Sequence, residues 1–146
     1  MQMIDIEIFQ REHIDQVYDI SCEAFPVAWS KEDLLRETSN DTAVNLVALV
    51  GDEVIGYLQC WYTKDEADLI NIAVKNRYRR QEVAHALLVY LLETLRQRGV
   101  CDLFLEVRVS NLPAQKLYES FHFEIVNRRK RYYINGEDAF IMWTEL

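Results

Sequence analysis

The sequence contains few residues that interrupt regular structure. Only four of its 146 residues are glycine and two are proline, so each turn signal can be assigned to one place in the chain. There is also no internal repeat, no low-complexity tract and no linker rich in Pro, Gly or Ser. The length suits one domain of ordinary size, and we expect a single domain over residues 1–146.

Cysteines, apolar runs and targeting signals are scarce or missing as well. The three cysteines are far apart and odd in number, with no CxxC spacing and no Cys/His cluster, which argues against a disulfide framework and a metal site. No apolar run approaches the length that spans a bilayer, and Met1 to Phe9 lacks the apolar core of a signal peptide. We therefore expect a cytoplasmic protein that binds no metal and no membrane.

Basic residues are in the minority. The 24 acidic and 16 basic residues give a formal net charge of -8, and a field of that sign repels phosphate backbones. We expect no nucleic-acid binding, and the charge suits a basic protein or peptide as partner. Composition does not fix an oligomeric state; we expect a monomer or a weak dimer.

The sequence does contain a clear order of strand and helix patterns. Half of its residues are hydrophobic, and they alternate in some segments and recur at helical spacing in others. The expected elements are a strand over 4–8, helices over 11–25 and 30–38, strands over 43–50, 54–63 and 67–74, a long helix before Gly99, a strand over 101–107, a helix over 111–120, and strands over 123–134 and 137–144. Gly51-Asp52 and Asn135-Gly136 suit tight hairpin turns. Antiparallel strands followed by a βαβ crossover predict an α+β fold, with a mixed sheet and helices on both faces.

The most informative stretch joins a strand to the long helix. Four basic residues follow Val74 within Lys75 to Arg80. The start of a helix presents backbone N–H groups and the positive end of the helix dipole. Together these features attract phosphate groups. The alternative, on the residues alone, is a solvated basic turn.

This stretch resembles a known family. The run NIAVKNRYRRQEVAHALL is similar to the acetyl-CoA signature of the GCN5-related N-acetyltransferases, R/Q-x-x-G-x-G/A. The resemblance extends over nearly the whole chain through FPVAWS, DEADLINIAV, LEVRVSNLPAQKLYESFHF and RRKRYYINGEDAFIM. It is closest to the bacterial enzymes that acetylate the N-terminal alanine of the eighteenth small-subunit ribosomal protein. The family fold that it implies is one mostly antiparallel sheet of about seven strands with a splayed central pair.

The resemblance implies acetyl-coenzyme A as the acetyl donor. Backbone groups of the splayed strand would hold the thioester and pantetheine, and the loop with the helix start would hold the diphosphate. The matching positions are Ile72, Ala73 and Val74 for the first part, Arg80, Gln81, Glu82, Val83, Ala84 and His85 for the second, and Asn111 for a further coenzyme contact. On the residues alone, the first three suit an ordinary buried strand, and Asn111 suits a helix N-cap.

Two positions depart from the family pattern. Glu82 stands where the first motif glycine is expected, and His122 stands where a glycine usually follows the last helix. Glycine lets the backbone approach a phosphate without a Cβ in the way, and a like charge at ~4 Å costs on the order of 1 kcal/mol in water. A first-turn Glu also stabilises the helix dipole. These departures bear on cofactor affinity, and they leave open a cofactor-impaired sensor or interaction module.

The reaction needs one group that takes a proton from the amine and another that protonates the departing thiolate. An α-amine with a pKa of about 7.7–8.0 is largely protonated at neutral pH, and a carboxylate can accept that proton. Glu106 lies in an apolar strand pattern that would raise its pKa, and it matches the family's base. Tyr118 matches the family's acid. The alternatives are a carboxylate paired to Arg108 or Arg128, and a core tyrosine.

The acceptor side is less sharply defined. Trp29, Tyr132, Tyr133, Glu137 and Asp138 resemble the family's peptide-binding loops, where the acids would meet a positive amino terminus or early arginines. We expect direct acetyl transfer to a protein N-terminal amine, on a basic ribosomal protein. A lysine side chain or a small-molecule amine stays open as acceptor, because one scaffold serves many amines.

Overall fold

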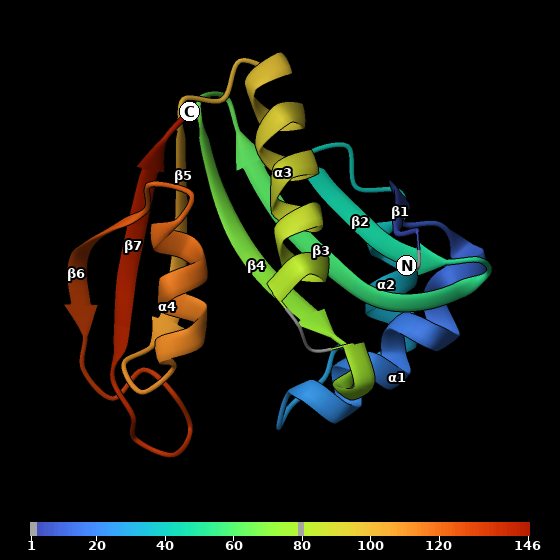
Figure 1. Cartoon of the computed structure of the whole chain (residues 1–146), viewed down its shortest axis with the longest axis horizontal. Helices are drawn as coiled ribbons and strands as arrows, with labels where there is room; N and C mark the ends of the chain where they lie inside the picture. Colours follow the sequence, from blue (N-terminus) through green and yellow to red (C-terminus); the bar gives the residue numbers. More distant parts are fainter. Residues whose placement is uncertain (1–2, 79–80) are drawn as a thin grey trace.

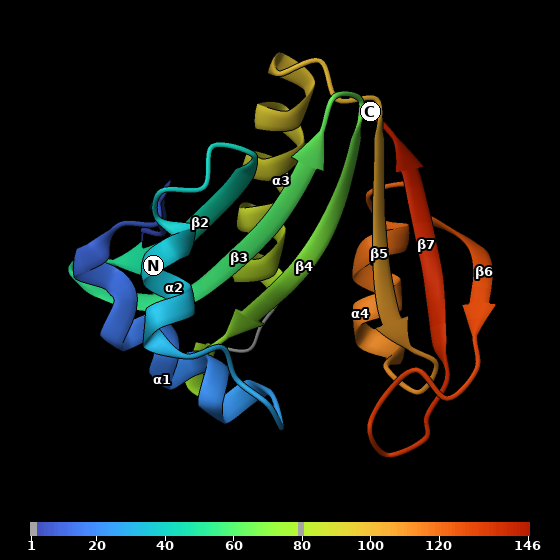
Figure 2. The same ribbon diagram turned by 180° about the vertical axis from the view of Figure 1, so that it is seen from behind.

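One sheet holds all the strands that the structure describes. The computed structural model describes residues 3–78 and 81–146, and its seven strands follow the order β1-β2-β3-β4-β5-β7-β6 (Figures 1 and 2). The strands are β1 (Asp5–Ile8), β2 (Ala43–Val50), β3 (Glu53–Thr63), β4 (Glu66–Val74), β5 (Asp102–Arg108), β6 (Glu124–Arg129) and β7 (Ala139–Glu145). All neighbours are antiparallel except β4 and β5, which run parallel. The predicted mixed sheet of an α+β fold is confirmed.

The helices cover both faces of this sheet. They are α1 (Ile14–Ala24), α2 (Lys31–Glu37), α3 (Gln81–Gln97) and α4 (Leu112–Glu119), with short 3₁₀ turns at Arg11–His13 and Asn76–Tyr78. Figure 1 shows α3 and α4 in front of the sheet, and Figure 2, seen from behind, shows α1 and α2 in front. The helix α3 forms the crossover that two parallel strands require.

Local sequence signals set the ends of the helices. Ser30 Oγ accepts a hydrogen bond from Asp33 N at 3.1 Å, and Asn111 Oδ1 accepts one from Ala114 N at 3.2 Å. Both side chains therefore act as N-caps, Asn111 as predicted and Ser30 at the start of the predicted helix over 30–38. Gly99, with a φ of +80°, follows the last turn of α3, as expected for a glycine that ends a helix.

Buried side chains attach the helices to the two faces. Leu87, Leu91 and Leu95 of α3 are fully buried in the core of one face. Val17 and Ile20 of α1 are buried in the core of the other face. Burying one such side chain stabilises the fold by about 1.5–3 kcal/mol, so these helices form firm supports on either side of the sheet.

The strands β4 and β5 pair only at their beginnings. Their ladder joins Glu66–Asp68 to Asp102–Phe104 and extends no further among the described residues. The β3–β4 register shifts at the same level, so that Ile70 is an extra residue on β4. Such a bulge bends its strand and increases the local twist, and beyond it β4 leaves β5 (Figures 1 and 2). The splayed central pair is therefore present, and the bulge supplies its physical cause.

The final hairpin differs from the prediction. The strand β6 ends at Arg129 and β7 begins at Ala139, so Asn135-Gly136 does not connect paired strands directly. Gly136 N donates to Tyr133 O at 2.8 Å, which makes a local turn inside the 130–138 loop. Side-chain contacts described below draw this segment out of the sheet. The other predicted turn, Gly51-Asp52, does join β2 to β3.

A histidine takes a left-handed conformation after α4. His122 has a φ of +69°, and the next residue, Phe123, donates its N–H to Tyr118 O at 3.1 Å. Left-handed backbone costs an L-residue roughly 1–2 kcal/mol, whereas glycine adopts it readily. The glycine that is usual at this position in the family fits the same backbone without that cost.

We expect His122→Gly to stabilise the protein. Relief of the left-handed strain outweighs the greater freedom of glycine in the unfolded chain, which leaves a net gain of about 0.5–1 kcal/mol. Urea denaturation measures this gain as a higher midpoint. Ser120→Gly is the control, because Ser120 has a φ of −66° and glycine there should only destabilise. A His122→Gly midpoint at or below that of the parent protein would contradict the strain argument.

Candidate active site

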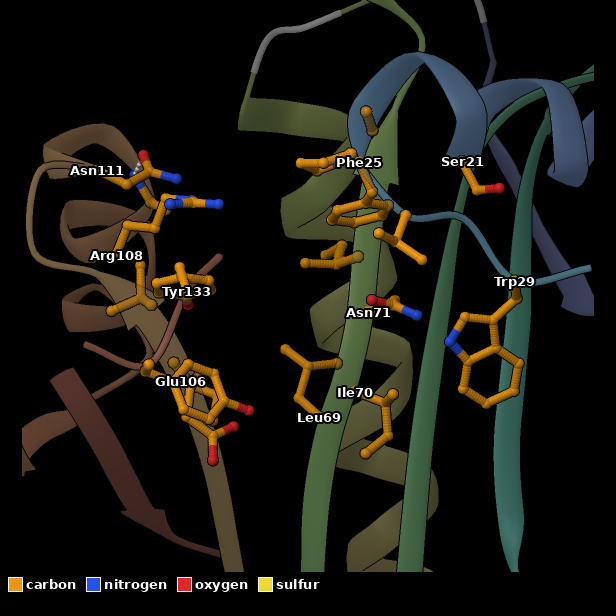
Figure 3. A pocket seen from close by; sticks show the side chains of 18 of the residues that line it. Ser21, Phe25, Trp29, Leu69, Ile70, Asn71, Glu106, Arg108, Asn111 and Tyr133 are labelled. Carbon is orange, nitrogen blue, oxygen red and sulfur yellow. Dashed lines mark hydrogen bonds between the residues drawn. The ribbon is translucent and has the colours of Figure 1, made fainter. Parts of the chain in front are cut away.

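A cleft of about 470 Å³ lies where β4 and β5 diverge. Figure 3 shows side chains of the two strands facing each other across it. Its walls are β4 at Leu69–Ile72, β5 at Leu105–Arg108 with the start of α4, the segment from Ser21 to Trp29, and the tip of the β6–β7 loop. The opening therefore brings together segments that are far apart in the sequence.

Glu106 projects from β5 into this cleft. Leu105 and Val107, its neighbours along the strand, are buried in the core, so strand alternation turns Glu106 to the opposite face. Its side chain is 31% exposed, and its Oε1 lies 3.6 Å from Arg129 NH1. The sequence suggested Arg108 or Arg128 as alternative partners, but these arginines pair with other carboxylates.

The proton affinity of Glu106 is raised in this position. Burial raises the pKa of the Glu106 carboxyl, the Arg129 guanidinium lowers it, and the carboxylate of Asp68 raises it again. Burial disfavours the charged form and so makes the carboxylate a better proton acceptor. The pKa of Glu106 is therefore raised, which is the direction that the apolar strand pattern predicted.

Tyr118 reaches the same cleft from α4. It is 6% exposed and packs on Phe123 with ring centroids 5.7 Å apart. Burial raises the pKa of the Tyr118 phenol far above its ordinary value, so the phenol holds its proton at neutral pH. A protonated hydroxyl at this position can act as a proton donor.

A buried glutamine, which sequence reasoning missed, ties α4 to the end of β5. Gln115 Nε2 donates to the carbonyl oxygens of Arg108 at 3.1 Å and Val109 at 3.0 Å. Tyr118 follows Gln115 by one helical turn, so these bonds help to fix the phenol relative to Glu106. Gln115 is 7% exposed, and the available signal in the sequence was a glutamine on the same helix as the apolar Leu117.

The edge of β4 that faces the cleft suits a ligand rich in amide groups. Beyond Asp68, no described residue of β5 pairs with this edge, while β3 stays paired to the opposite edge up to Val74. An unpaired strand edge offers backbone donors and acceptors to an extended chain. Ile72 lines the cleft, Ala73 is buried and Val74 is half-buried. The pantetheine arm of coenzyme A, which contains amides, fits such an edge.

The predicted diphosphate cradle is described only in part. Arg80 lies outside the described residues, and the side chain of Gln81 is likewise not described. Glu82 is exposed on the first turn of α3, and Val83 is 2% exposed in the core, so that only the backbone of Val83 can meet a ligand. Ala84 is half-buried, and the exposed His85 lies 4.9 Å from the ring of Phe121 between centroids. Of the predicted cofactor residues that the structure describes, Ile72 and Asn111 line the cleft itself.

Two cations of the basic loop hold the loop in place. Lys75 Nζ and Arg77 NH2 lie 2.9 Å and 2.6 Å from Glu53 Oε2, and the hydrogen bonds from Lys75 and Arg77 lower the pKa of Glu53.

Gly56 of β3 lies close to α3. A Cβ at Gly56 would lie 3.1 Å from Ala73 O and 3.2 Å from Val83 Cγ1 of α3. Glycine at this position therefore permits the close approach of α3 to the sheet.

The predicted acceptor residues divide into two groups. Trp29, Tyr132 and Tyr133 line the cleft. Glu137 and Asp138 do not line it, and the structure places both in ion pairs. Glu137 accepts from Ser110 N at 2.9 Å and Arg108 NH1 at 3.1 Å, and Asp138 accepts from Arg128 Nε at 2.8 Å. These two acids therefore hold the β6–β7 loop.

The guanidinium of Arg108 completes this arrangement. It lies 4.0 Å from the centroid of the Tyr133 ring while it donates to Glu137 and to Asn135 Oδ1. Stacking and hydrogen bonding together fix the tyrosine at the mouth of the cleft.

Within residues 3–78 and 81–146, no group of three or more His, Cys, Asp or Glu side chains is placed to hold a metal ion. No helix in the described part of the chain is long and apolar enough to cross a membrane.

Comparison with known proteins places this cleft in a family context. Residues 14–123 match the model of the Acetyltransferase (GNAT) family. The chain is 39% identical over 137 residues to the putative [ribosomal protein bS18]-alanine N-acetyltransferase of Bacillus subtilis (strain 168), covering 92% of this chain and 91% of the relative. The crystal structure of the ribosomal-protein-S18-alanine N-acetyltransferase from Escherichia coli has a TM-score of 0.88 at 34% identity, over 98% of this chain and 94% of that one. Arabidopsis thaliana NAA60 in complex with acetyl-CoA shares the fold, with a TM-score of 0.87 at 18% identity over 99% of both chains.

We expect the pKa of Glu106 to respond in opposite directions to its two charged neighbours. Arg129→Gln removes a cation that favours the carboxylate, so the pKa should rise. Asp68→Asn removes a like charge, so the pKa should fall. A pH titration of the ¹³C-labelled carboxyl resonance by NMR measures both shifts. Arg131→Gln is the control, because it removes a nearby cation that makes no contact with Glu106. Equal shifts in all three variants would show that the pKa of Glu106 does not depend on Arg129 and Asp68 specifically.

Proposed function

The chain belongs to the GNAT acetyltransferase family, and on that premise we propose that it acetylates the amino-terminal amine of a ribosomal protein, with the N-terminal alanine of bS18 as acceptor. The chain is an N-acetyltransferase. Relatives that carry this activity in their names match nearly the whole chain. The observation that carries the proposal is that Glu106 and Tyr118 reach one cleft that is open to the unpaired edge of β4.

Acetyl-coenzyme A, when bound, supplies an acetyl thioester. The edge of β4 from Ile72 to Val74 aligns the extended arm of the donor, and a backbone N–H of that edge polarises the thioester carbonyl as negative charge develops on its oxygen. Arg80 to His85 serve the diphosphate through the backbone of the first turn of α3 and through basic side chains. Asn111 lines the cleft and adds a polar contact from its amide group.

Glu106 takes the proton from the acceptor amine, directly or through one water molecule. Its raised proton affinity brings the carboxylate closer to the pKa of an α-amine, which improves proton transfer near neutral pH. The amine nitrogen then attacks the carbonyl carbon, and the carbon–sulfur bond breaks. No covalent intermediate on the protein is needed for this direct transfer.

Tyr118 gives its phenolic proton to the departing thiolate. Burial keeps that proton in place until the thiolate forms. The second proton of the attacking nitrogen, which is lost as the amide forms, restores the Tyr118 phenol through solvent, and the proton taken by Glu106 leaves to solvent before the next turnover. Trp29, Tyr132 and Tyr133 surround the cleft on the acceptor side and contact the first residues of the substrate. The acceptor chain therefore enters between the α1–α2 segment and the β6–β7 loop.

A peptide panel tests the acceptor class. We expect a peptide with an N-terminal alanine to gain one acetyl group at its α-amine, and tandem mass spectrometry locates the modification. The control peptide has the same sequence with a blocked amino terminus and one internal lysine. Acetylation of the control peptide at its lysine would contradict the proposed acceptor. Acetylation of neither peptide would contradict it too, and if the protein still bound acetyl-coenzyme A, that result would indicate a sensor.

We expect Glu106→Gln to lower kcat by roughly 10²–10⁴-fold near neutral pH. The loss should shrink at high pH, because the α-amine, with a pKa of about 7.7–8.0, then loses its proton without help. Initial rates of coenzyme A release from pH 6 to 10 give the profile. Glu124→Gln, an exposed change on β6, controls for the lost charge. A deficit that stays constant over this range would assign Glu106 a structural role.

A further inference from the structure

A row of side chains crosses the sheet beside the cleft. Trp61 of β3 lies opposite Asp68 of β4, Asp68 lies opposite Phe104 of β5, and Phe104 lies opposite Trp143 of β7. Register partners share one face of a sheet. Trp61 Nε1 donates to Glu37 of α2 at 2.8 Å, so the row lies on the face that carries α1 and α2.

This row is reachable from solvent. In Figure 2 the helices α1 and α2 lie over the half of the sheet around β2 and β3, while β5, β7 and β6 carry no helix on the visible face. Trp61 is 40% exposed, Asp68 is exposed, and Phe104 and Trp143 are half-buried. The row is thus a carboxylate between aromatic side chains on an open surface.

Asp68 differs from the other acids near the cleft because it has no partner in the described part of the chain. Glu137 and Asp138 form ion pairs with arginines, and Glu106 faces Arg129. Asp68 forms no ion pair or hydrogen bond with residues 3–78 or 81–146, and burial raises the pKa of its carboxyl. Although Asp68 as a residue is exposed, its carboxyl is partly desolvated, and such a carboxylate is stabilised by a cation that arrives with a ligand.

We propose that Asp68 is a specificity-determining residue, which binds a cationic side chain at the second or third position of the acceptor polypeptide between Trp61 and Phe104. The inference rests on the proposed function, because it takes the acceptor amine to lie at Glu106. Asp68 lies opposite Phe104, and Glu106 is two residues further along β5, a rise of roughly 6.6 Å at about 3.3 Å per residue. An extended chain rises about 3.3 Å per residue, so its second or third residue arrives at Asp68.

The chemistry of the row selects the kind of cation. The faces of Trp and Phe attract guanidinium and ammonium groups, and a carboxylate pairs with a guanidinium through two hydrogen bonds. The formal net charge of -8 adds long-range attraction for a basic chain. From the sequence, Glu137 and Asp138 were expected to meet early arginines of the substrate. Because both are paired internally, the structure assigns that role to Asp68.

The test compares two acceptor peptides with the same N-terminal alanine. One carries arginine at positions 2 and 3, and the other carries citrulline, which keeps the shape and removes the charge. We expect the parent enzyme to use the arginine peptide with a kcat/KM about fivefold higher, as one ion pair near a surface allows, mainly through a lower KM. In Asp68→Asn the ratio should fall to near one. Asp68→Glu should retain most of the preference, and Asp68→Lys should favour citrulline.

Asp52→Asn is the matched control, because it removes the same charge from the exposed β2–β3 turn and should keep the parental ratio. Equal use of both peptides by the parent enzyme would overturn the role of Asp68 and leave N-terminal acetylation intact. A preference that survives in Asp68→Asn would also overturn it. If the parent enzyme acetylates neither peptide, the proposed function fails and this inference fails with it. If the ratio falls equally in Asp52→Asn, the preference comes from the net charge of the protein, and the proposed site at Asp68 is wrong.

Discussion

The divergence of β4 from β5 is the constraint on which the rest of the structure depends. Their ladder ends at Asp68 and Phe104, and the bulge at Ile70 bends β4 at the same level. A continuous parallel ladder would use the backbone donors and acceptors of both strands on each other. Because the ladder stops, one strand presents its backbone and the other presents Glu106 to a shared space. In the proposed mechanism, the geometry of these two strands separates donor binding from proton transfer.

Polar contacts around the end of β5 give this space a fixed shape. Gln115 holds α4 to the strand, and Arg108 joins Glu137 and the ring of Tyr133. Each contact links a different segment to the same short stretch of backbone, so Tyr118 and the β6–β7 loop share one support with Glu106. Catalytic groups need such support because small displacements from the reactive geometry reduce rates strongly.

Much of the fold could be predicted from the sequence, because strand alternation, helix caps and the Gly51-Asp52 turn are local signals. The resemblance also indicated Glu106 and Tyr118, which the structure brings to one cleft. The bulge at Ile70 could not be predicted, since an extra residue in an apolar strand leaves the composition unchanged. The partners of the charged side chains were missed for a similar reason. Glu106 faces Arg129 because β6 and β5 lie on either side of β7 in the sheet, a proximity that depends on the strand order and not on neighbours in the sequence.

The cation that faces Glu106 comes from the margin of the sheet. All of β6 is exposed, and Arg129 is its last residue, so this strand contributes little to either core. Substitutions along it can alter the electrostatic environment of the carboxylate while the packing that specifies the fold stays as it is. Over evolutionary time, the working pH of such an enzyme can therefore drift through changes at an edge strand, independently of the sequence that makes the chain fold.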